Sequence, residues 1–248
     1  GHDRGAGECV SFSVLYYAAL FILAGIPLED MYMMATPLHS QNFIDMKDGV
    51  LTNNRRLVTK IMWCNGTELS AKARRALENE EITMVCTNEG YVHTLYPEAT
   101  IPRERYQRFC RQLSSFLETP PTNEILVNFL RQAPKWQPYF QFSAVVDERL
   151  TYFPAEDLYT AEETNLSANA PTLDRLADTL PKENPRHEPL PRRVLISRPL
   201  EEIYKELGRD FTVEFKTFCH ISPRLPAADK DYHDSFAISL QGLNTREE

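Results

Sequence analysis

The residue types that could do chemistry begin with a cysteine close to the start of the sequence. Cys9 follows Gly7-Glu8 and directly precedes a long apolar stretch, so we expect it in the first turn of a helix. There, unpaired backbone N–H groups and the positive end of the helix dipole favour a thiolate. The same N–H groups could stabilise an oxyanion during acyl transfer. Cys9 is therefore a candidate nucleophile, although a buried structural thiol is the commoner role for a cysteine.

A candidate base and a candidate orienting residue follow Cys9. His39 begins an expected strand thirty residues later, and the intervening helix, turn and strand are long enough to bring the chain back to the helix start. A loop over Asp45 to Asp48 would set His39 opposite Asn54 on the same sheet face. The Asn54 side chain could then hold the imidazole in place.

Other choices for the orienting residue stay open. A tight Asp48-Gly49 turn would instead place Val58 opposite His39, and a one-residue slip of the strand would make Asn53 the candidate. Asp45 and Asp48 are weaker choices. Turn or strand-end chemistry is the alternative role for the two asparagines.

The elements that position these residues can be predicted from apolar patterns. The stretch from Glu8 to Gly25 is apolar on nearly every side, which predicts a buried helix that ends at Gly25. Extended runs follow at residues 31–35, 39–46 and 50–58, the last reaching as far as residue 63 in one reading. A helix is expected over residues 69–79, and a hairpin over residues 82–86 and 91–96.

The second half of the chain has a different pattern. Helical spacing predicts a helix after Pro102 and another from Glu124 to Ala133, capped by Thr122 or Asn123. A strand is expected over residues 140–146. Prolines gather between residues 161 and 199, which is typical of a linker or a surface wrap. Beyond it we expect a helix over residues 200–207, a strand over 211–215 and a last strand over 236–240.

The order of the candidate residues resembles that of a known family. The segments Cys9-Val10-Ser11, Pro37-Leu38-His39-Ser40 and Asp48-Gly49-Val50-Leu51-Thr52-Asn53-Asn54 resemble the transglutaminase-like core of the papain-like cysteine protease superfamily. The motif covers about residues 7–56 and the fold extends to about residue 96. Asn54 stands where that family usually has Asp.

The resemblance implies a fold and an activity. We expect an α+β protein with four consecutive parts: a transglutaminase-like core of one buried helix on an antiparallel sheet (1–100), a helical elaboration (101–160), a Pro-rich linker or wrap (161–198) and a small C-terminal α/β extension (199–248). The implied reaction is cysteine-dependent acyl transfer on an amide, either hydrolysis or deamidation and transamidation. Cys9 would be the nucleophile, His39 the base and Asn54 the orienting residue, with a protein or peptide substrate and with no cofactor or metal.

Composition excludes some functions and leaves a second one open. The 248 residues include 27 Lys and Arg against 35 Asp and Glu, a net charge of −8, which disfavours nucleic acid as a partner. The longest apolar stretch is about 13 residues, short of the roughly 20 that span a bilayer, so we expect no integral membrane segment. The five cysteines form no C-x-x-C pair. The alternative function is a catalytically degenerate module that binds a protein or peptide through aromatic residues such as Trp136, Tyr139 and Phe140.

Overall fold

The computed structural model describes residues 7–54, 56–161, 173, 176, 180 and 185–232. Helices and strands are mixed along the chain and most strand pairs are antiparallel, which makes the protein α+β as expected. The chain forms two compact units. Unit 1 contains the residues up to Leu57, Ala76–Phe116 and the segment from Pro223, and unit 2 contains Val58–Arg75 and Leu117–Ser222. The units therefore interleave along the sequence, unlike the four consecutive parts expected from its pattern.

Unit 1 is built on a sheet with the strand order β11-β7-β6-β5-β1-β2-β3-β4. The pairs from β7 to β3 are antiparallel, and β11 joins β7 in parallel. The strands are β1 (Met31–Ala35), β2 (Ser40–Ile44), β3 (Val50–Asn53), β4 (Arg56–Thr59), β5 (Met84–Cys86), β6 (Tyr91–His93), β7 (Glu98–Ala99) and β11 (Asp231–Tyr232). The β5–β6 hairpin confirms the pairing expected around Asn88-Glu89-Gly90.

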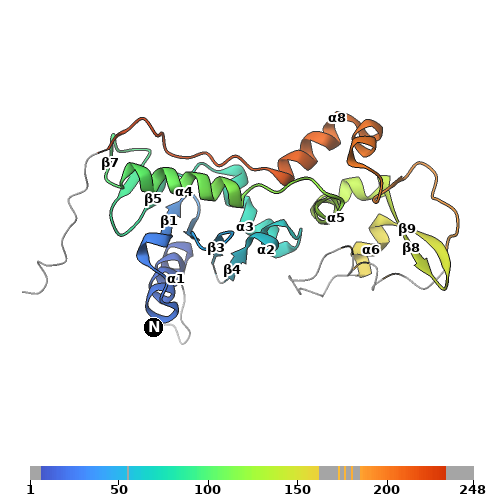
Figure 1. Cartoon of the computed structure of the whole chain (residues 1–248), viewed down its shortest axis with the longest axis horizontal. Helices are drawn as coiled ribbons and strands as arrows, with labels where there is room; N and C mark the ends of the chain where they lie inside the picture. The colour runs from blue at the N-terminus through green and yellow to red at the C-terminus, as the bar shows by residue number, and fades with distance from the viewer. Residues whose placement is uncertain are drawn as a thin grey trace, which may run out of the picture. The chain divides into compact units, whose positions relative to one another are not determined.

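Two helices cover the two faces of this sheet (Figure 1). On one face, α4 (Arg103–Phe116) places Phe109 with its ring centroid 4.9 Å from Tyr32 and 5.9 Å from Phe43. On the other face, α1 (Cys9–Ala24) is joined to β2 by a buried hydrogen bond, in which Asn42 Nδ2 donates to the Ser13 carbonyl at 2.8 Å. The middle of β2 is therefore enclosed from both sides, and all five of its residues are buried.

The helix α1 has the expected bounds but not the expected burial. Gly25 adopts the left-handed conformation (φ 66°) and its N–H bonds to the Leu20 carbonyl, so the helix ends where the sequence predicts. However, Ser13 is its one fully buried residue, and Leu23 is 83% exposed. The expectation of a buried helix was therefore wrong. An apolar sequence on every side of the helix does not indicate which side the rest of the protein covers. None of the helices in the described part of the chain is long and apolar enough to cross a membrane.

Unit 2 combines helices with a small sheet in the order β10-β8-β9. Its elements are α2 (Lys60–Cys64), α5 (Asn123–Gln132), the 3-10 helix η2 (Pro134–Tyr139), β8 (Phe140–Val146), β9 (Arg149–Pro154), α6 (Ala155–Ala161), β10 (Val194–Leu195) and α8 (Leu200–Cys219). Thr122 caps α5 as expected, because its Oγ1 accepts from the Ile125 N–H at 3.2 Å. The core includes Phe129, whose ring lies 5.5 Å from Phe215 and 5.6 Å from Phe218. The short 3-10 helix η1 (Leu28–Asp30) belongs to unit 1, and α3 (Glu68–Asn79) runs from unit 2 into unit 1.

The helix α8 corrects an expected strand. Residues 211–215 were expected to be extended because Phe211, Val213 and Phe215 alternate with polar residues. Instead α8 has a kink at Gly208, which is non-helical (φ 80°, ψ −165°), and the chain is helical again beyond it. Phe211, Phe215 and Phe218 are buried at helical spacing, whereas Val213 is exposed. The alternation of Phe211, Val213 and Phe215 fits a strand, but Phe211 and Phe215 also fit a helix. The spacing of Phe215 to Phe218, three residues, fits only the helix.

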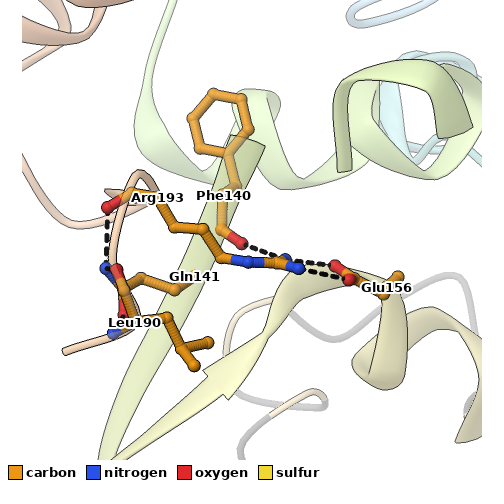
Figure 2. A network of polar contacts seen from close by, with 5 residues as sticks. All are labelled: Phe140, Gln141, Glu156, Leu190 and Arg193. Atoms are coloured by element: carbon orange, nitrogen blue, oxygen red, sulfur yellow. Dashed lines mark hydrogen bonds and ion pairs between the residues drawn. The ribbon is translucent and has the colours of Figure 1, made fainter. Parts of the chain in front are cut away.

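A polar network fastens the segment before β10 to the β10-β8-β9 sheet of unit 2 (Figure 2). The buried Gln141 side chain donates to the Arg193 carbonyl at 2.7 Å and accepts from the Leu190 N–H at 2.7 Å. Arg193 in turn binds both carboxylate oxygens of Glu156 at 2.6 Å and donates to the Phe140 carbonyl at 3.2 Å. The network thus links three segments that are far apart in the sequence.

Two further expectations concern strands. The extended run from residue 50 to 58 is not continuous: β3 ends at Asn53, Asn54 has a positive φ of 49°, and β4 begins at Arg56. Past β4 the chain turns into the helix α2, so the strand does not reach residue 63. The strand expected over residues 236–240 lies outside the described residues.

Candidate active site

Cys9 is the first residue of α1, as the sequence predicts. The N–H of Phe12 closes the first turn on the Glu8 carbonyl at 2.9 Å. The thiol is half-buried, and within the described residues it makes no hydrogen bond or ion pair. The N-terminal N–H groups of α1 and the positive end of its dipole lie at this point, which is a suitable environment for an anionic sulfur or oxyanion.

The direction of α1 brings Cys9 to the end of the sheet where β2 begins. A short connection joins α1 to β1, and β1 is antiparallel to β2, so α1 runs in the same direction as β2. Starting from the Asn42–Ser13 hydrogen bond, Cys9 lies one helical turn back, about 6 Å. His39 lies three strand residues back, about 10 Å. The two residues are therefore at nearly the same level along the layer.

His39 follows a two-residue turn formed by Pro37 and Leu38. The Thr36 N–H donates to the His39 carbonyl at 2.8 Å, and the His39 N–H donates to the Thr36 carbonyl at 3.4 Å. This pair closes the β1–β2 hairpin and makes Thr36 the cross-strand neighbour of half-buried His39. Because side chains alternate along a strand, regular alternation gives His39 the face opposite to that of Asn42. The structure thus brings Cys9 and His39 to one end of the sheet without placing them in contact.

The hairpin register changes the argument for the orienting residue. Ile44 pairs with Val50 and Phe43 with Leu51, so the loop spans five residues, 45–49, rather than the expected four. Continuing this register sets Ser40, not His39, opposite Asn54, and the facing argument for Asn54 is wrong by one residue. Asn54 is exposed.

The same register puts Asn53, rather than Asn54, on the sheet face that alternation gives to His39. Asn53 falls opposite Gln41, on the face that alternation gives to His39, and it is buried. The two aspartates considered as weaker choices lie at the other end of β2. Asp45 is there held by the Arg108 Nε at 2.6 Å. Asp45 and Asp48 are therefore far from His39.

Sequence reasoning missed two buried amides beside these residues. Gln41 is 2% exposed, and neither polar atom of its side chain has a hydrogen-bond partner within the described residues. Asn42 is fully buried and joins β2 to α1. The signal was the polar run Ser40-Gln41-Asn42 inside an expected core strand, because buried amides need a partner and usually have a defined role.

The other cysteines differ from Cys9 in their surroundings. Burial raises the pKa of Cys64, Cys86 and Cys110, and it raises the pKa of Cys219 to about 12. Their thiolate forms are therefore scarce near neutral pH. In the described part of the chain no group of three or more His, Cys, Asp or Glu side chains could hold a metal ion.

A concave surface lies in unit 2, between η2 and α8. This groove has a volume of about 710 Å³ and is lined by Lys135, Trp136, Tyr139, Arg209, Asp210, Val213 and Glu214. Glu214 fixes one wall, because it accepts from the Trp136 Nε1 at 2.8 Å and pairs with Lys135 at 2.5 Å. Of the three aromatic residues named from the sequence, Trp136 and Tyr139 line the groove, whereas Phe140 is fully buried.

Comparison of the chain with protein-family models, curated proteins and solved structures gives no match.

Proposed function

We propose that the protein catalyses cysteine-dependent acyl transfer on an amide, with Cys9 as nucleophile and His39 as base. The observation that carries this proposal is the Asn42–Ser13 hydrogen bond, from which helix and strand rise put Cys9 and His39 at nearly the same level at one end of the α1–β2 layer. A thiol at a helix start and an imidazole at the start of the strand beneath it are the two groups that this chemistry needs.

The proposed reaction has two stages. The Cys9 sulfur attacks the amide carbonyl of a protein or peptide, and the first-turn N–H groups of α1 stabilise the oxyanion. His39 then gives a proton to the leaving amine, and water or a second amine takes the acyl group from the sulfur. For this, the His39 imidazole has to reach round the end of the sheet toward α1. Asn53 is preferred to Asn54 as the residue that holds the imidazole before it turns toward Cys9, because Asn53 shares the starting face of His39.

Alkylation of the cysteines tests this proposal. Iodoacetamide at pH 6.5, followed by peptide mapping, should label Cys9 much faster than half-buried Cys86, the matched control whose pKa is raised by burial. His39→Ala should slow the labelling of Cys9 and leave that of Cys86 unchanged. Equal labelling of the two thiols, or no effect of His39→Ala on Cys9, would refute the thiol mechanism.

The groove in unit 2 supports a second candidate, a peptide-binding module. Trp136 offers a rigid aromatic wall, and Arg209 and Asp210 make no hydrogen bond or ion pair within the described residues, so charges of both signs are available to a ligand. A tryptic digest of casein passed over the immobilised protein tests this candidate. Retention of peptides that is lost in Trp136→Ala but kept in Cys9→Ala would favour binding over catalysis.

A further inference from the structure

One carboxylate is fastened to the turn that carries His39. The Glu80 side chain, just after the end of α3, accepts from the Thr36 Oγ1 at 2.5 Å and from the Leu38 N–H at 3.1 Å through the same oxygen, Oε2. Glu80 is half-buried and all of these residues belong to unit 1. A surface glutamate does not usually make two such contacts to a two-residue turn, so the role of Glu80 needs an explanation.

The hydrogen bonds determine how the turn is held. The Thr36 hydroxyl has one proton, and the shorter, charge-assisted contact directs it to Glu80 rather than to the His39 carbonyl, which is 3.2 Å away. The Leu38 N–H is in the turn itself, where no strand partner is available to it. Glu80 therefore fixes both sides of the turn, and His39 is the next residue along the chain.

The carboxylate also lies near the backbone of His39. The two distances from the Thr36 hydroxyl put the Glu80 oxygen within roughly 6 Å of the His39 carbonyl, and charges at about this range shift the ionisation of a neighbour. Thr36 and His39 are cross-strand neighbours, so alternation gives His39 the face on which the Thr36 hydroxyl meets Glu80. A negative charge there stabilises a protonated imidazole.

Two other charged groups near Glu80 matter for this turn. Arg224 donates to the Asn79 carbonyl at 2.6 Å, one residue from Glu80, and acts in the opposite sense as a cation. Glu81 is exposed and makes no hydrogen bond or ion pair within the described residues. Glu81 therefore has the charge of Glu80 without its contacts, which makes it a matched control.

We propose that Glu80 is a positioning residue for His39, holding the turn that presents the imidazole and favouring the protonated form of that imidazole. This inference rests on the proposed function, since it assigns a partner to the proposed base. Loss of the Glu80 charge disfavours the protonated imidazole, so the Cys9 thiolate that this positive charge would stabilise forms at higher pH. A role in folding alone would change stability without changing the pH dependence.

Two measurements on the full chain test the proposal. The first is the pH profile of Cys9 alkylation by iodoacetamide in the wild type, Glu80→Gln and Glu81→Gln. Glu80→Gln keeps a hydrogen-bond acceptor and removes the charge, so the midpoint should move upward by about half a pH unit, which is about threefold slower labelling below the midpoint. The second is the pH midpoint of the His39 imidazole NMR signal, assigned with His39→Gln, which should move downward in Glu80→Gln. Glu81→Gln should move neither midpoint.

The outcomes separate the inference from the function that it deepens. If His39→Ala slows Cys9 labelling but Glu80→Gln behaves like Glu81→Gln in both measurements, the role of Glu80 is refuted and the thiol mechanism stands. If Cys9 labelling does not depend on His39, the proposed function fails and Glu80 has no base to position. If Glu80→Gln lowers the melting temperature and leaves both midpoints unchanged, Glu80 is a structural residue only.

Discussion

The substitution Gly49→Ala should destabilise unit 1 through two separable effects. Gly49 lies in the loop that sets the register between β2 and β3, and its φ is 92°. An added methyl group would meet the rings of Phe43 and Phe116, each with an atom at 2.9 Å. Both rings are buried and pack edge to face with their centroids 5.9 Å apart, so neither can move aside easily.

The magnitude follows from these two effects. A non-glycine residue with positive φ costs about 1–2 kcal/mol, and an extra methyl group in a packed core costs about 1–3 kcal/mol. We therefore expect Gly49→Ala to lose about 2–5 kcal/mol of stability. Gly25 is the control, because its φ is 66° but a methyl group there would have no atom within 4 Å. Gly25→Ala should lose only the backbone part, about 1–2 kcal/mol.

Hydrogen exchange can measure the loss in unit 1 alone. Both tryptophans, Trp63 and Trp136, belong to unit 2, so denaturation followed by their fluorescence reports on unit 2. Exchange of the amides of β2 and β3, read by mass spectrometry, reports on unit 1. Gly49→Ala should accelerate exchange in β2 and β3 more than Gly25→Ala does. Equal effects of the two substitutions would refute the argument from crowding.

Four further substitutions test other parts of the fold. Leu23→Ala should change stability by less than about 0.5 kcal/mol because Leu23 is exposed, whereas Leu113→Ala in the core should cost about 2–5 kcal/mol, both measured by hydrogen exchange of the unit 1 amides. Gln141→Leu should cost unit 2 about 1–3 kcal/mol, since it leaves half-buried backbone groups of Leu190 and Arg193 without this partner, and tryptophan fluorescence will report it. Burial disfavours the charged form of Glu156, but the hydrogen bonds and charge of Arg193 outweigh burial and lower the pKa of Glu156. The stabilisation that results should be present near neutral pH and disappear as the pH falls through that lowered pKa. Melts at pH 7 and pH 3 should show this loss in the wild type and not in Glu156→Gln.

Local signals in the sequence predicted most of the elements. The apolar stretch before Gly25 gave the bounds of α1, Thr122 capped α5 as expected, and the hairpin around Asn88-Glu89-Gly90 was confirmed. These features depend on neighbouring residues only. Burial depends on which distant segments meet, and for this reason the exposure of α1 and the helix beyond the kink at Gly208 could not be predicted.

The candidate site could be predicted in its order but not in its register. Cys9 at a helix start and His39 at a strand start follow from local pattern. The choice between Asn53 and Asn54 depends on one residue of loop length between β2 and β3, which alternation turns into a change of face. The contact of Glu80 with Thr36 joins residues 44 positions apart and has no local signal at all.

The interleaving of the two units has a consequence for how the protein is made. The chain enters and leaves each unit more than once, and the backbone N–H of Ile82 and the hydroxyl of Tyr106 bond to carbonyls of residues 224 and 226. During synthesis on a ribosome, unit 1 thus cannot complete these hydrogen bonds until residues 224 and 226 are made, more than a hundred residues after Ile82 and Tyr106. Neither unit corresponds to one continuous stretch of the gene, so a truncation that removes the chain beyond residue 222 would take bonding partners from unit 1 while leaving every residue of unit 2 in place.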